Sequence, residues 1–455
     1  MQRIFARRAR TAEGWQTDVA VTVEDGRITA VTEGQSPLSG DVQVDTLLPA
    51  LGNLHSHTFQ RAMAGMTEHR AAGQDSFWTW RSLMYRFVDQ LTPEDYEAIA
   101  ALTFMEMMEA GYASVGEFHY VHHTSGGTPY GRLTELSDRV FAAAAGTGIG
   151  LTHLPVLYSC GGAGEQPLAG GQLRFGNDIE RFATLVTQAR AHAARALPSD
   201  ARVGVAPHSL RAIRPADLDE AVALAEGNPI HIHIAEQPRE VEEITAWLSA
   251  RPVDWLLAHA EVDAQWCLIH ATHMTETETV AMARSGAVAG LCPITEANLG
   301  DGPFNGPLYL QNGGAFGVGS DSNVRIALGE ELRMLEYSQR LHHLQRNVMI
   351  AGEGSVGAAL YLRAASGGAR ALGRNSGRIV PGALADLVAI DTSCPALCPL
   401  DGDAVLDGLC FSAPDRIVTD LWSAGRHRVR SGRHVEHDLI VRTYQTRLRA
   451  LLTRI

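Results

Sequence analysis

Two short histidine pairs have the residue types and spacing to bind a metal ion. His55 and His57 lie one residue apart after an apolar run, and His231 and His233 repeat this spacing within the run IHIHI. Alternate residues of a β-strand point to the same face, so both rings of a pair can face one ion. Imidazole binds borderline metals such as zinc at about 2.0–2.1 Å. Taken alone, either pair could equally consist of surface or core residues.

Polar residues at the ends of other apolar runs could complete this chemistry. Glu236 follows His233 by three residues, His270 and His273 end the run CLIHATH, and Asp321 ends the apolar run of GVGSDSN. Water activation at a metal needs a carboxylate that accepts the proton and later delivers it to a leaving group. Glu236 has that chemistry. Taken singly, Glu236 could instead solvate a loop, and Asp321 could be a turn or N-cap residue.

The elements that must position these residues are parallel strands. Short apolar runs alternate with helical stretches such as TPEDYEAIAALTFMEMMEAG, and this alternation predicts an α/β fold with crossover helices. The predicted strands cover 48–54, 113–118, 150–157, 202–207, 230–234, 267–270, 287–291 and 315–319. Eight such units predict a (β/α)8 TIM barrel over 49–376, whose chemistry lies at the carboxyl ends of the strands. The polar residues follow strands one, five, six and eight.

Both ends of the chain predict a small β-domain. The segment DVAVTVEDGRITAVTEG alternates apolar and polar residues around Asp25-Gly26, which is a strong hairpin signal. Near the other end, GRIVPGALADLVAIDT and RIVTDLWSAGRHRVRSGRHV show similar short β-branched runs. We therefore expect a β-sandwich domain from 1–48 plus 377–436, followed by a C-terminal helix over 437–455.

The amino-acid composition excludes some kinds of binding partner and metal site, and it indicates a cellular compartment. A net charge of −13 argues against nucleic-acid binding, which needs a basic face. The six cysteines are scattered, as expected in a reducing compartment. The segment MQRIFARRARTAEGWQ lacks the apolar core of a signal peptide, and no apolar stretch reaches about 20 residues, so we expect a cytoplasmic protein without a membrane partner. The 455 residues include no lysine, which excludes a metal pair bridged by a modified lysine.

The combined pattern of HxH, HxxE, His and Asp on successive strand ends resembles the amidohydrolase superfamily over nearly the whole chain. The resemblance implies one divalent metal ion, Zn²⁺ or Fe²⁺, with a set of four ligands: His55, His57, His233 and Asp321. It implies catalytic roles for Glu236 in proton transfer, for His270 beside the attacked carbon, and for Asp321 in sharing proton handling. His231 is expected to pack rather than coordinate.

Longer runs resemble the superfamily's deiminases of histidine degradation: NLHSHTFQRAMAG, SFWTWRSLMYRF, VGEFHYVHH, APHSLRA, HIHIAEQ and GSDSNVRIALGEELRMLEY. This resemblance implies hydrolysis of N-formimino-L-glutamate to N-formyl-L-glutamate and ammonia by a homodimer. The implied substrate-binding residues are Gln60, Arg81, Tyr120, His208 and Arg211. Arginine suits a dicarboxylate substrate because its planar fork binds carboxylates in bidentate fashion. One departure is Ile294 in LCPITEANLGDG, where a hydroxyl residue is expected.

Two alternatives remain open at this stage. A guanine or other heterocycle deaminase of the same superfamily would stack its substrate on aromatic side chains and would not require Arg81 and Arg211. A non-catalytic barrel that binds a metabolite would hold the histidines for structure alone, and would release no ammonia from any substrate.

Overall fold

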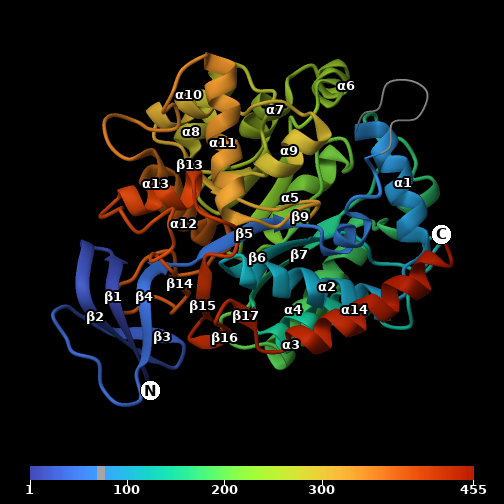
Figure 1. The fold of residues 1–455 in the computed structure, drawn as a ribbon. Coiled ribbons are helices and arrows are strands. Elements are labelled where there is room, and N and C mark those ends of the chain that lie inside the picture. Colours follow the sequence, from blue (N-terminus) through green and yellow to red (C-terminus); the bar gives the residue numbers. More distant parts are fainter. Residues whose placement is uncertain (69–76) are drawn as a thin grey trace.

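The computed structural model describes residues 1–68 and 77–455, with only the backbone described at 77–79 and 82. Segments from the two ends of the chain form one sheet, and the middle of the chain alternates between parallel strands and helices (Figure 1).

The terminal sheet contains eight strands in the order β17-β16-β15-β14-β4-β1-β2-β3. Their bounds are β1 Gln2–Thr11, β2 Gly14–Glu24, β3 Arg27–Thr32, β4 Val42–Pro49, β14 Leu387–Ile390, β15 Val418–Ser423, β16 Arg426–Arg430 and β17 Arg433–His434. The two halves meet where β14 runs antiparallel to β4. The predicted hairpin joins β2 to β3, and both Asp25 and Gly26 adopt the positive φ that its tight turn requires.

This sheet has its own hydrophobic core, to which both ends of the chain contribute. Ile4 and Val21 from the first segment pack in one cluster with Leu387 and Trp422 from the last. A sheet that both ends of the chain build is therefore present. It is one continuously hydrogen-bonded sheet and not two separate sheets, because the β4–β14 pairing joins the halves edge to edge.

The middle of the chain forms two parallel sheets. One contains β5 Leu51–Ser56, β6 Tyr112–His119, β7 Gly150–Leu157, β8 Arg202–Val203 and β9 Ala206–Pro207, and the other contains β10 Ile230–Ile234, β11 Trp266–His270, β12 Val288–Leu291 and β13 Ala315–Val318. Most of these strands are buried along their whole length, as expected of a parallel sheet covered by helices.

Isolated parallel bridges connect the two sheets at both edges. Val205 pairs with Ile230 and Ser209 with His233 at one edge, and Ser56 pairs with Asp321 at the other. Among the described residues, the strands of the predicted (β/α)8 barrel therefore form two parallel sheets joined by isolated bridges and not one continuous ladder. At the first edge the strand is broken at Gly204, where a Cβ would lie 2.2 Å from the carbonyl oxygen of Pro229.

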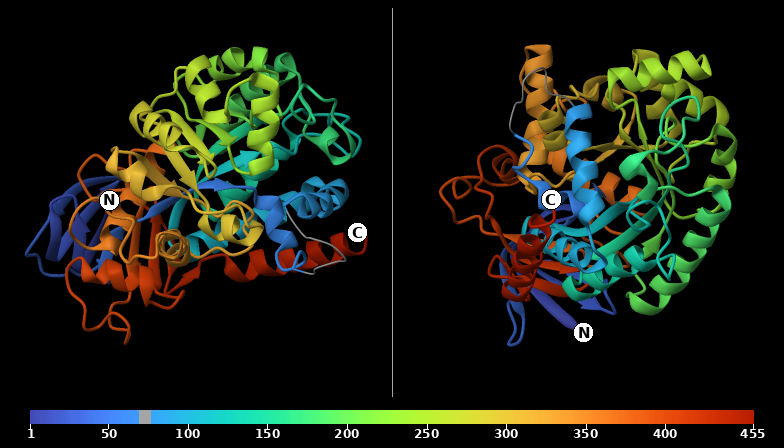
Figure 2. Two further views of the ribbon diagram at one scale, coloured as in Figure 1. Left: turned by 90° about the horizontal axis from the view of Figure 1, so that it is seen from above. Right: turned by 90° about the vertical axis from the view of Figure 1, so that its right-hand side faces the viewer.

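Helices surround the parallel strands, as the right-hand view of Figure 2 shows for the middle of the chain. The larger ones are α1 Phe77–Gln90, α2 Pro93–Glu109, α3 Glu135–Thr147, α4 Ile179–Ala196, α6 Pro238–Leu248, α7 Pro252–His259, α8 Glu276–Ser285, α11 Leu328–His343, α12 Val356–Ala371, α13 Ala404–Phe411 and α14 His437–Leu452. Shorter ones are α5 Leu218–Ala223, α9 Pro293–Leu299 and α10 Gly306–Gln311. The last helix, α14, lies along α2 (Figure 1).

The predicted strand positions agree closely with those observed. The ranges 150–157 and 230–234 coincide with β7 and β10, and the predicted 113–118 lies inside β6. Two ranges differ. The range 48–54 spans the end of β4 and the start of β5, because the chain passes from the terminal sheet into the parallel sheet at Ala50. The range 202–207 is divided into β8 and β9 at Gly204.

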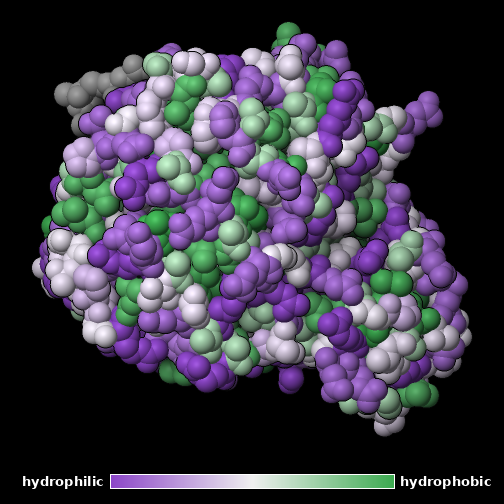
Figure 3. All heavy atoms as spheres, turned by 180° about the vertical axis from the view of Figure 1, so that it is seen from behind, coloured by the Kyte–Doolittle hydropathy of each residue, from purple (hydrophilic) through white to green (hydrophobic). Residues whose placement is uncertain are grey.

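The outer surface carries both polar and apolar residues. On the face opposite that of Figure 1, hydrophilic and hydrophobic side chains are interspersed (Figure 3). Within the described ranges, no helix has the length and apolar character needed to cross a bilayer.

Candidate active site

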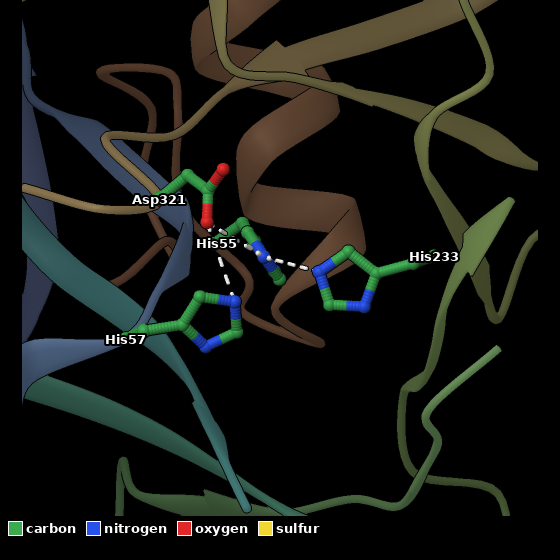
Figure 4. A group of neighbouring side chains, drawn as sticks. All are labelled: His55, His57, His233 and Asp321. Carbon is green, nitrogen blue, oxygen red and sulfur yellow. Dashed lines mark hydrogen bonds and ion pairs between the residues drawn. The ribbon is translucent and has the colours of Figure 1, made fainter. Parts of the chain in front are cut away.

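Four side chains converge where the parallel strands end (Figure 4). His55 and His57 come from β5 and the residue after it, His233 from β10, and Asp321 from the turn after β13. One ligand atom of each residue lies within 4.8 Å of those of the other three, and all four residues are buried. The Oδ1 atom of Asp321 is 3.5 Å from Nε2 of His55 and 3.3 Å from Nε2 of His57. The four residues that the sequence predicted as metal ligands are thus brought together.

Backbone contacts fix the orientation of two rings. Nδ1 of His57 lies 3.0 Å from the carbonyl oxygen of Phe118, and Nδ1 of His233 lies 3.1 Å from that of His208. A carbonyl can only accept, so each Nδ1 must donate, and in the neutral ring Nε2 is left with a lone pair. Nε2 of His233 is 3.1 Å from Nε2 of His55. A cation between these two nitrogens could be coordinated by both of them.

The charge states of the cluster also fit a divalent cation. Burial lowers the pKa of His57 and His233, and it lowers the pKa of His55 to about 3. Burial alone would raise the pKa of Asp321, but His55, His57 and His270 outweigh it and the pKa falls. Three neutral imidazoles and one carboxylate are a donor set for a metal such as zinc.

The backbone holds β5 tightly against the turn after β13. The amide of Asp321 donates to the carbonyl of His55, and the amide of His57 donates to the carbonyl of Asp321, at 3.0 and 2.9 Å. Gly319 permits this approach, since a Cβ there would lie 2.7 Å from both the backbone nitrogen and oxygen of His55. Asp321 itself has a positive φ of 46°, an uncommon conformation that commonly marks functional sites.

Glu236 and His270 lie beside the cluster. Nε2 of His270 is 3.8 Å from Oε1 of Glu236 and 3.8 Å from Oδ2 of Asp321. Burial raises the pKa of Glu236. Burial opposes protonation of His270, but the carboxylates of Glu236, Glu296 and Asp321 outweigh it and raise the pKa to about 10. Ionisable groups with pKa values perturbed in this way, beside a buried cluster of candidate ligands, are typical of functional sites.

Two glutamates that sequence reasoning missed support this pair. Nδ1 of His270 contacts Oε1 of Glu296 at 3.2 Å, which turns Nε2 toward Glu236. Oε2 of Glu240 accepts the backbone amide of Glu236 at 3.0 Å. Glu296 lies on α9, just past the end of β12, so the strand-end rule used for the other residues could have found it.

A pocket with about 540 Å³ of empty space opens onto the cluster and contains the predicted substrate-binding residues. The predicted substrate-binding residues that line it are Gln60, Arg81, Tyr120, His208 and Arg211. Its lining also includes His57, His233, Glu236, His270 and Asp321. Arg81 and Arg211 also line an adjoining, more open pocket formed with the loop 161–164 and α6. The two arginines therefore lie between the cluster and the outer opening.

Arg211 has a buried donor that is available to a ligand. The residue is 6% exposed, and its Nη1 has no hydrogen-bond partner among the described residues. Burial alone would lower the pKa of Arg211, but Tyr158, Glu240 and Glu236 raise it, so the guanidinium stays charged. An unpaired buried donor on a cation is costly unless an anion binds it.

Tyr158 is a further pocket residue that the sequence did not single out. Its hydroxyl accepts from Nη2 of Arg81 at 2.9 Å. Burial would raise the pKa of Tyr158, but Arg81 and Arg211 outweigh it and the pKa falls. Tyr158 directly follows β7, and the strand-end rule could have indicated it.

The remaining pocket residues form short polar contacts. Nε2 of Gln60 donates to the hydroxyl of Tyr120 at 2.8 Å, and Oε1 of Gln60 has no partner in the described part of the chain. His208 contacts the hydroxyl of Ser209 through Nδ1 at 2.9 Å. His231 does not join the site; its Nε2 contacts the carbonyl of Ala371 at 2.8 Å.

Comparisons with known proteins agree with this geometry. The model of the "Amidohydrolase family" matches residues 46–428, and that of the "Formimidoylglutamate deiminase HutF, N-terminal domain" matches residues 1–44. The chain is 47% identical to a formimidoylglutamate deiminase of Pseudomonas aeruginosa, over 99% of this chain and 100% of that one. It is 27% identical to a 5-methylthioadenosine/S-adenosylhomocysteine deaminase of Natronomonas pharaonis, over 94% of this chain and 90% of that one.

Solved structures are similar over the full length. The crystal structure of an amidohydrolase from Brucella melitensis has a TM-score of 0.94 and 47% identity, covering 99% of this chain and 100% of that chain. An adenosine deaminase from Xanthomonas campestris with bound zinc has a TM-score of 0.83 at 21% identity, covering 99% and 98%. The second likeness concerns the fold alone.

Proposed function

The chain belongs to the amidohydrolase family, and from this premise we propose that it hydrolyses N-formimino-L-glutamate to N-formyl-L-glutamate and ammonia. The observation that carries the proposal is the pairing, in one pocket, of a metal-binding cluster with Arg211, a buried cation whose Nη1 has no partner among the described residues. A dicarboxylate substrate with a hydrolysable carbon fits this pocket, because a carboxylate can bind Arg211 while the carbon lies beside the metal-binding cluster.

Arg81 and Arg211 bind the substrate carboxylates in this proposal. Charge-assisted bonds to a planar guanidinium fix both the position and the direction of a carboxylate. Gln60, Tyr120 and His208 line the same pocket and supply polar contacts to the rest of the substrate. Together these contacts orient the formimino carbon toward His57 and Asp321, which lie at the inner end.

Glu236 moves the protons in the proposed reaction. Its carboxylate accepts a proton from the attacking water, and then delivers it to the nitrogen that leaves as ammonia. His270 lies 3.8 Å from Glu236 and stabilises negative charge that develops at the attacked carbon's substituent. Asp321 shares in proton handling through its Oδ2 atom, which faces His270.

His55, His57, His233 and Asp321 would hold one divalent metal ion, which we propose is Zn²⁺, with Fe²⁺ compatible with the same donors. When bound, the ion supplies Lewis acidity, which makes water more acidic and polarises the substrate. A single ion agrees with the absence of lysine from the sequence.

The proposal extends to the architecture and the setting of the enzyme. We propose that the parallel sheets, joined by their bridges, form one (β/α)8 barrel over 49–376, with a single-sheet domain from 1–48 plus 377–436 and a helical unit over 437–455. Six cysteines without a disulfide support a reducing, cytoplasmic location. We also propose a role in histidine degradation and a homodimer without nucleic-acid or membrane partners; light scattering after size exclusion tests the dimer.

The experiment that tests the activity is a substrate panel scored for released ammonia. N-formimino-L-glutamate, N-formimino-L-aspartate, guanine and 5-methylthioadenosine are compared at equal concentration with metal-loaded protein. We expect N-formimino-L-glutamate to give the highest kcat/KM. Preference for a purine substrate would favour the heterocycle deaminase, and no ammonia from any compound would favour a metabolite-binding barrel.

A further inference from the structure

We propose that a second metal site, formed by His270, Cys292 and Asp321, lies at the inner end of the pocket behind its lining, and that a thiophilic divalent cation bound there blocks the reaction. This site goes beyond the proposed function, which uses one ion held by three histidines and Asp321.

The three side chains are close together and fully enclosed. One ligand atom of each lies within 4.8 Å of those of the other two, and His270, Cys292 and Asp321 are 1%, 0% and 6% exposed. They follow or end three successive strands, β11, β12 and β13, which are paired in parallel register. The parallel register brings the ends of β11 and β12 together, and the turn after β13 adds Asp321 to them.

Asp321 has one oxygen for each site. Its Oδ1 faces Nε2 of His55 and His57 at 3.5 and 3.3 Å, whereas its Oδ2 lies 3.8 Å from Nε2 of His270. A carboxylate with its oxygens divided in this way can bind one ion on each side. The second site can therefore fill without displacing an ion from the first.

Glu296 holds the other two ligands in place. Its Oε1 contacts Nδ1 of His270 at 3.2 Å and accepts the backbone amide of Cys292 at 2.8 Å. The Nδ1 contact leaves Nε2 of His270 facing Asp321 and Glu236. Such outer contacts are what orient metal-binding side chains.

The donor set selects the kind of ion. A thiolate, an imidazole and a carboxylate suit a soft or borderline cation such as Cd²⁺ or Zn²⁺, and not Mg²⁺ or Ca²⁺. Cys292 would coordinate as the thiolate, losing its proton as the cation binds. Such an ion would occupy Nε2 of His270 and lie beside Glu236, which withdraws both residues from proton handling.

The binding part of the test uses no substrate. Protein carrying one equivalent of metal is titrated with Cd²⁺, and bound equivalents are counted by dialysis and elemental analysis while the ultraviolet thiolate-to-Cd²⁺ absorption is followed. We expect a second equivalent and a thiolate band in the unmodified protein and in the control C410S, whose thiol is buried elsewhere. Both should be lost in C292S and in C292A. Cys394 and Cys398 stay in every variant, so their signal cancels.

The activity part rests on the proposed function. The second equivalent of Cd²⁺ should lower ammonia release from N-formimino-L-glutamate at least about tenfold, since general acid–base groups contribute factors of 10² or more. Each Cys292 variant, compared with its own rate before Cd²⁺, should be unaffected. A band that persists in both variants overturns the site, and full activity with the second ion bound overturns the block. Because binding is read without substrate, failure of the proposed reaction is a separate result.

Discussion

The two ends of the pocket hold ionisable groups of opposite kinds, a carboxyl group at the inner end and a guanidinium at the outer end. Burial raises the pKa of Glu236 at the inner end, while Arg211 at the outer end stays charged although it is almost fully enclosed. Such perturbed groups are typical of functional sites. The inner end is therefore suited to proton transfer and the outer end to holding an anion.

Glu236→Gln should lower kcat by about 10²–10⁴-fold, because an amide cannot accept the proton of the attacking water. The metal content should not change, since Glu236 is not among the four clustered ligands. Single-turnover ammonia release and elemental analysis measure the two quantities. Glu242→Gln, at an exposed position of α6, serves as the control. Wild-type turnover in the Glu236 variant would remove this residue from the mechanism.

Arg211→Ala should lower kcat/KM for N-formimino-L-glutamate by about 30- to 900-fold, equivalent to about 2–4 kcal/mol of transition-state stabilisation, because one substrate carboxylate loses its charge-assisted partner. Steady-state kinetics give the value. Arg214→Ala is the matched control: it lies three residues away, is partly exposed and pairs with Asp217. If the two variants behaved alike, Arg211 would have no role in substrate recognition.

Strand ends, at the scale of elements, set the geometry of the site. The positions of the strands and of their ends could be predicted well from the sequence, because buried parallel strands appear as apolar runs and their last residues face the pocket. The terminal hairpin was equally readable from Asp25-Gly26. Prediction failed where geometry depends on tertiary contact: the break at Gly204, the start of β5 beyond Ala50, and the edge-to-edge joining of the terminal strands.

The same limit applies to the candidate site. His55, His57 and His233 could be grouped from spacing and family resemblance. The strand-end rule could have marked Glu296 and Tyr158 as candidates, but it could not have assigned their roles, because these arise from contacts with His270 and Arg81 on other elements. A lone glutamate or tyrosine after a strand gives no sign of its partner.

Gly319→Ala should separate β13 from β5, because the added Cβ would lie 2.7 Å from the backbone of His55. Backbone atoms cannot move aside as a side-chain tip can, so we expect a loss of metal affinity and of about 1–3 kcal/mol of stability. Metal titration and urea unfolding measure both. Gly146→Ala in α3, where a Cβ meets nothing within 4 Å, should not destabilise the protein. Unchanged metal affinity in Gly319→Ala would contradict this account of the strand contact.

For the molecule as a whole, a buried ionic network joins the parallel strands to the terminal sheet. Arg374 pairs with Asp200 and Asp386, each at 3.0 Å, and Arg426 of β16 pairs with Asp200 at 2.7 Å. Burial would raise the pKa of Asp200, but Arg426 and Arg374 outweigh it and lower the pKa to about 2. The two regions are thus linked by charges that must remain paired.

Asp200→Asn should lower the free energy of unfolding by about 2 kcal/mol at neutral pH, from the pKa difference between about 2 in the folded state and 3.8. A lowered carboxyl pKa stabilises above the unfolded value, and this contribution is lost as the pH falls through the folded value. The difference from wild type should therefore hold down to about pH 4 and narrow below it. Urea unfolding across this range, with the exposed Asp401→Asn as control, measures it. A difference that widens in acid would contradict the pairing.

We propose that a metal cluster and two arginines form one site for a formimino dicarboxylate. The most direct measurement is ammonia released from N-formimino-L-glutamate by the purified protein before chelation, after chelation and after metal is restored. We predict rapid release, loss on chelation and recovery with one equivalent of metal per chain. Undiminished release by folded protein that elemental analysis shows to be free of metal would contradict the claim.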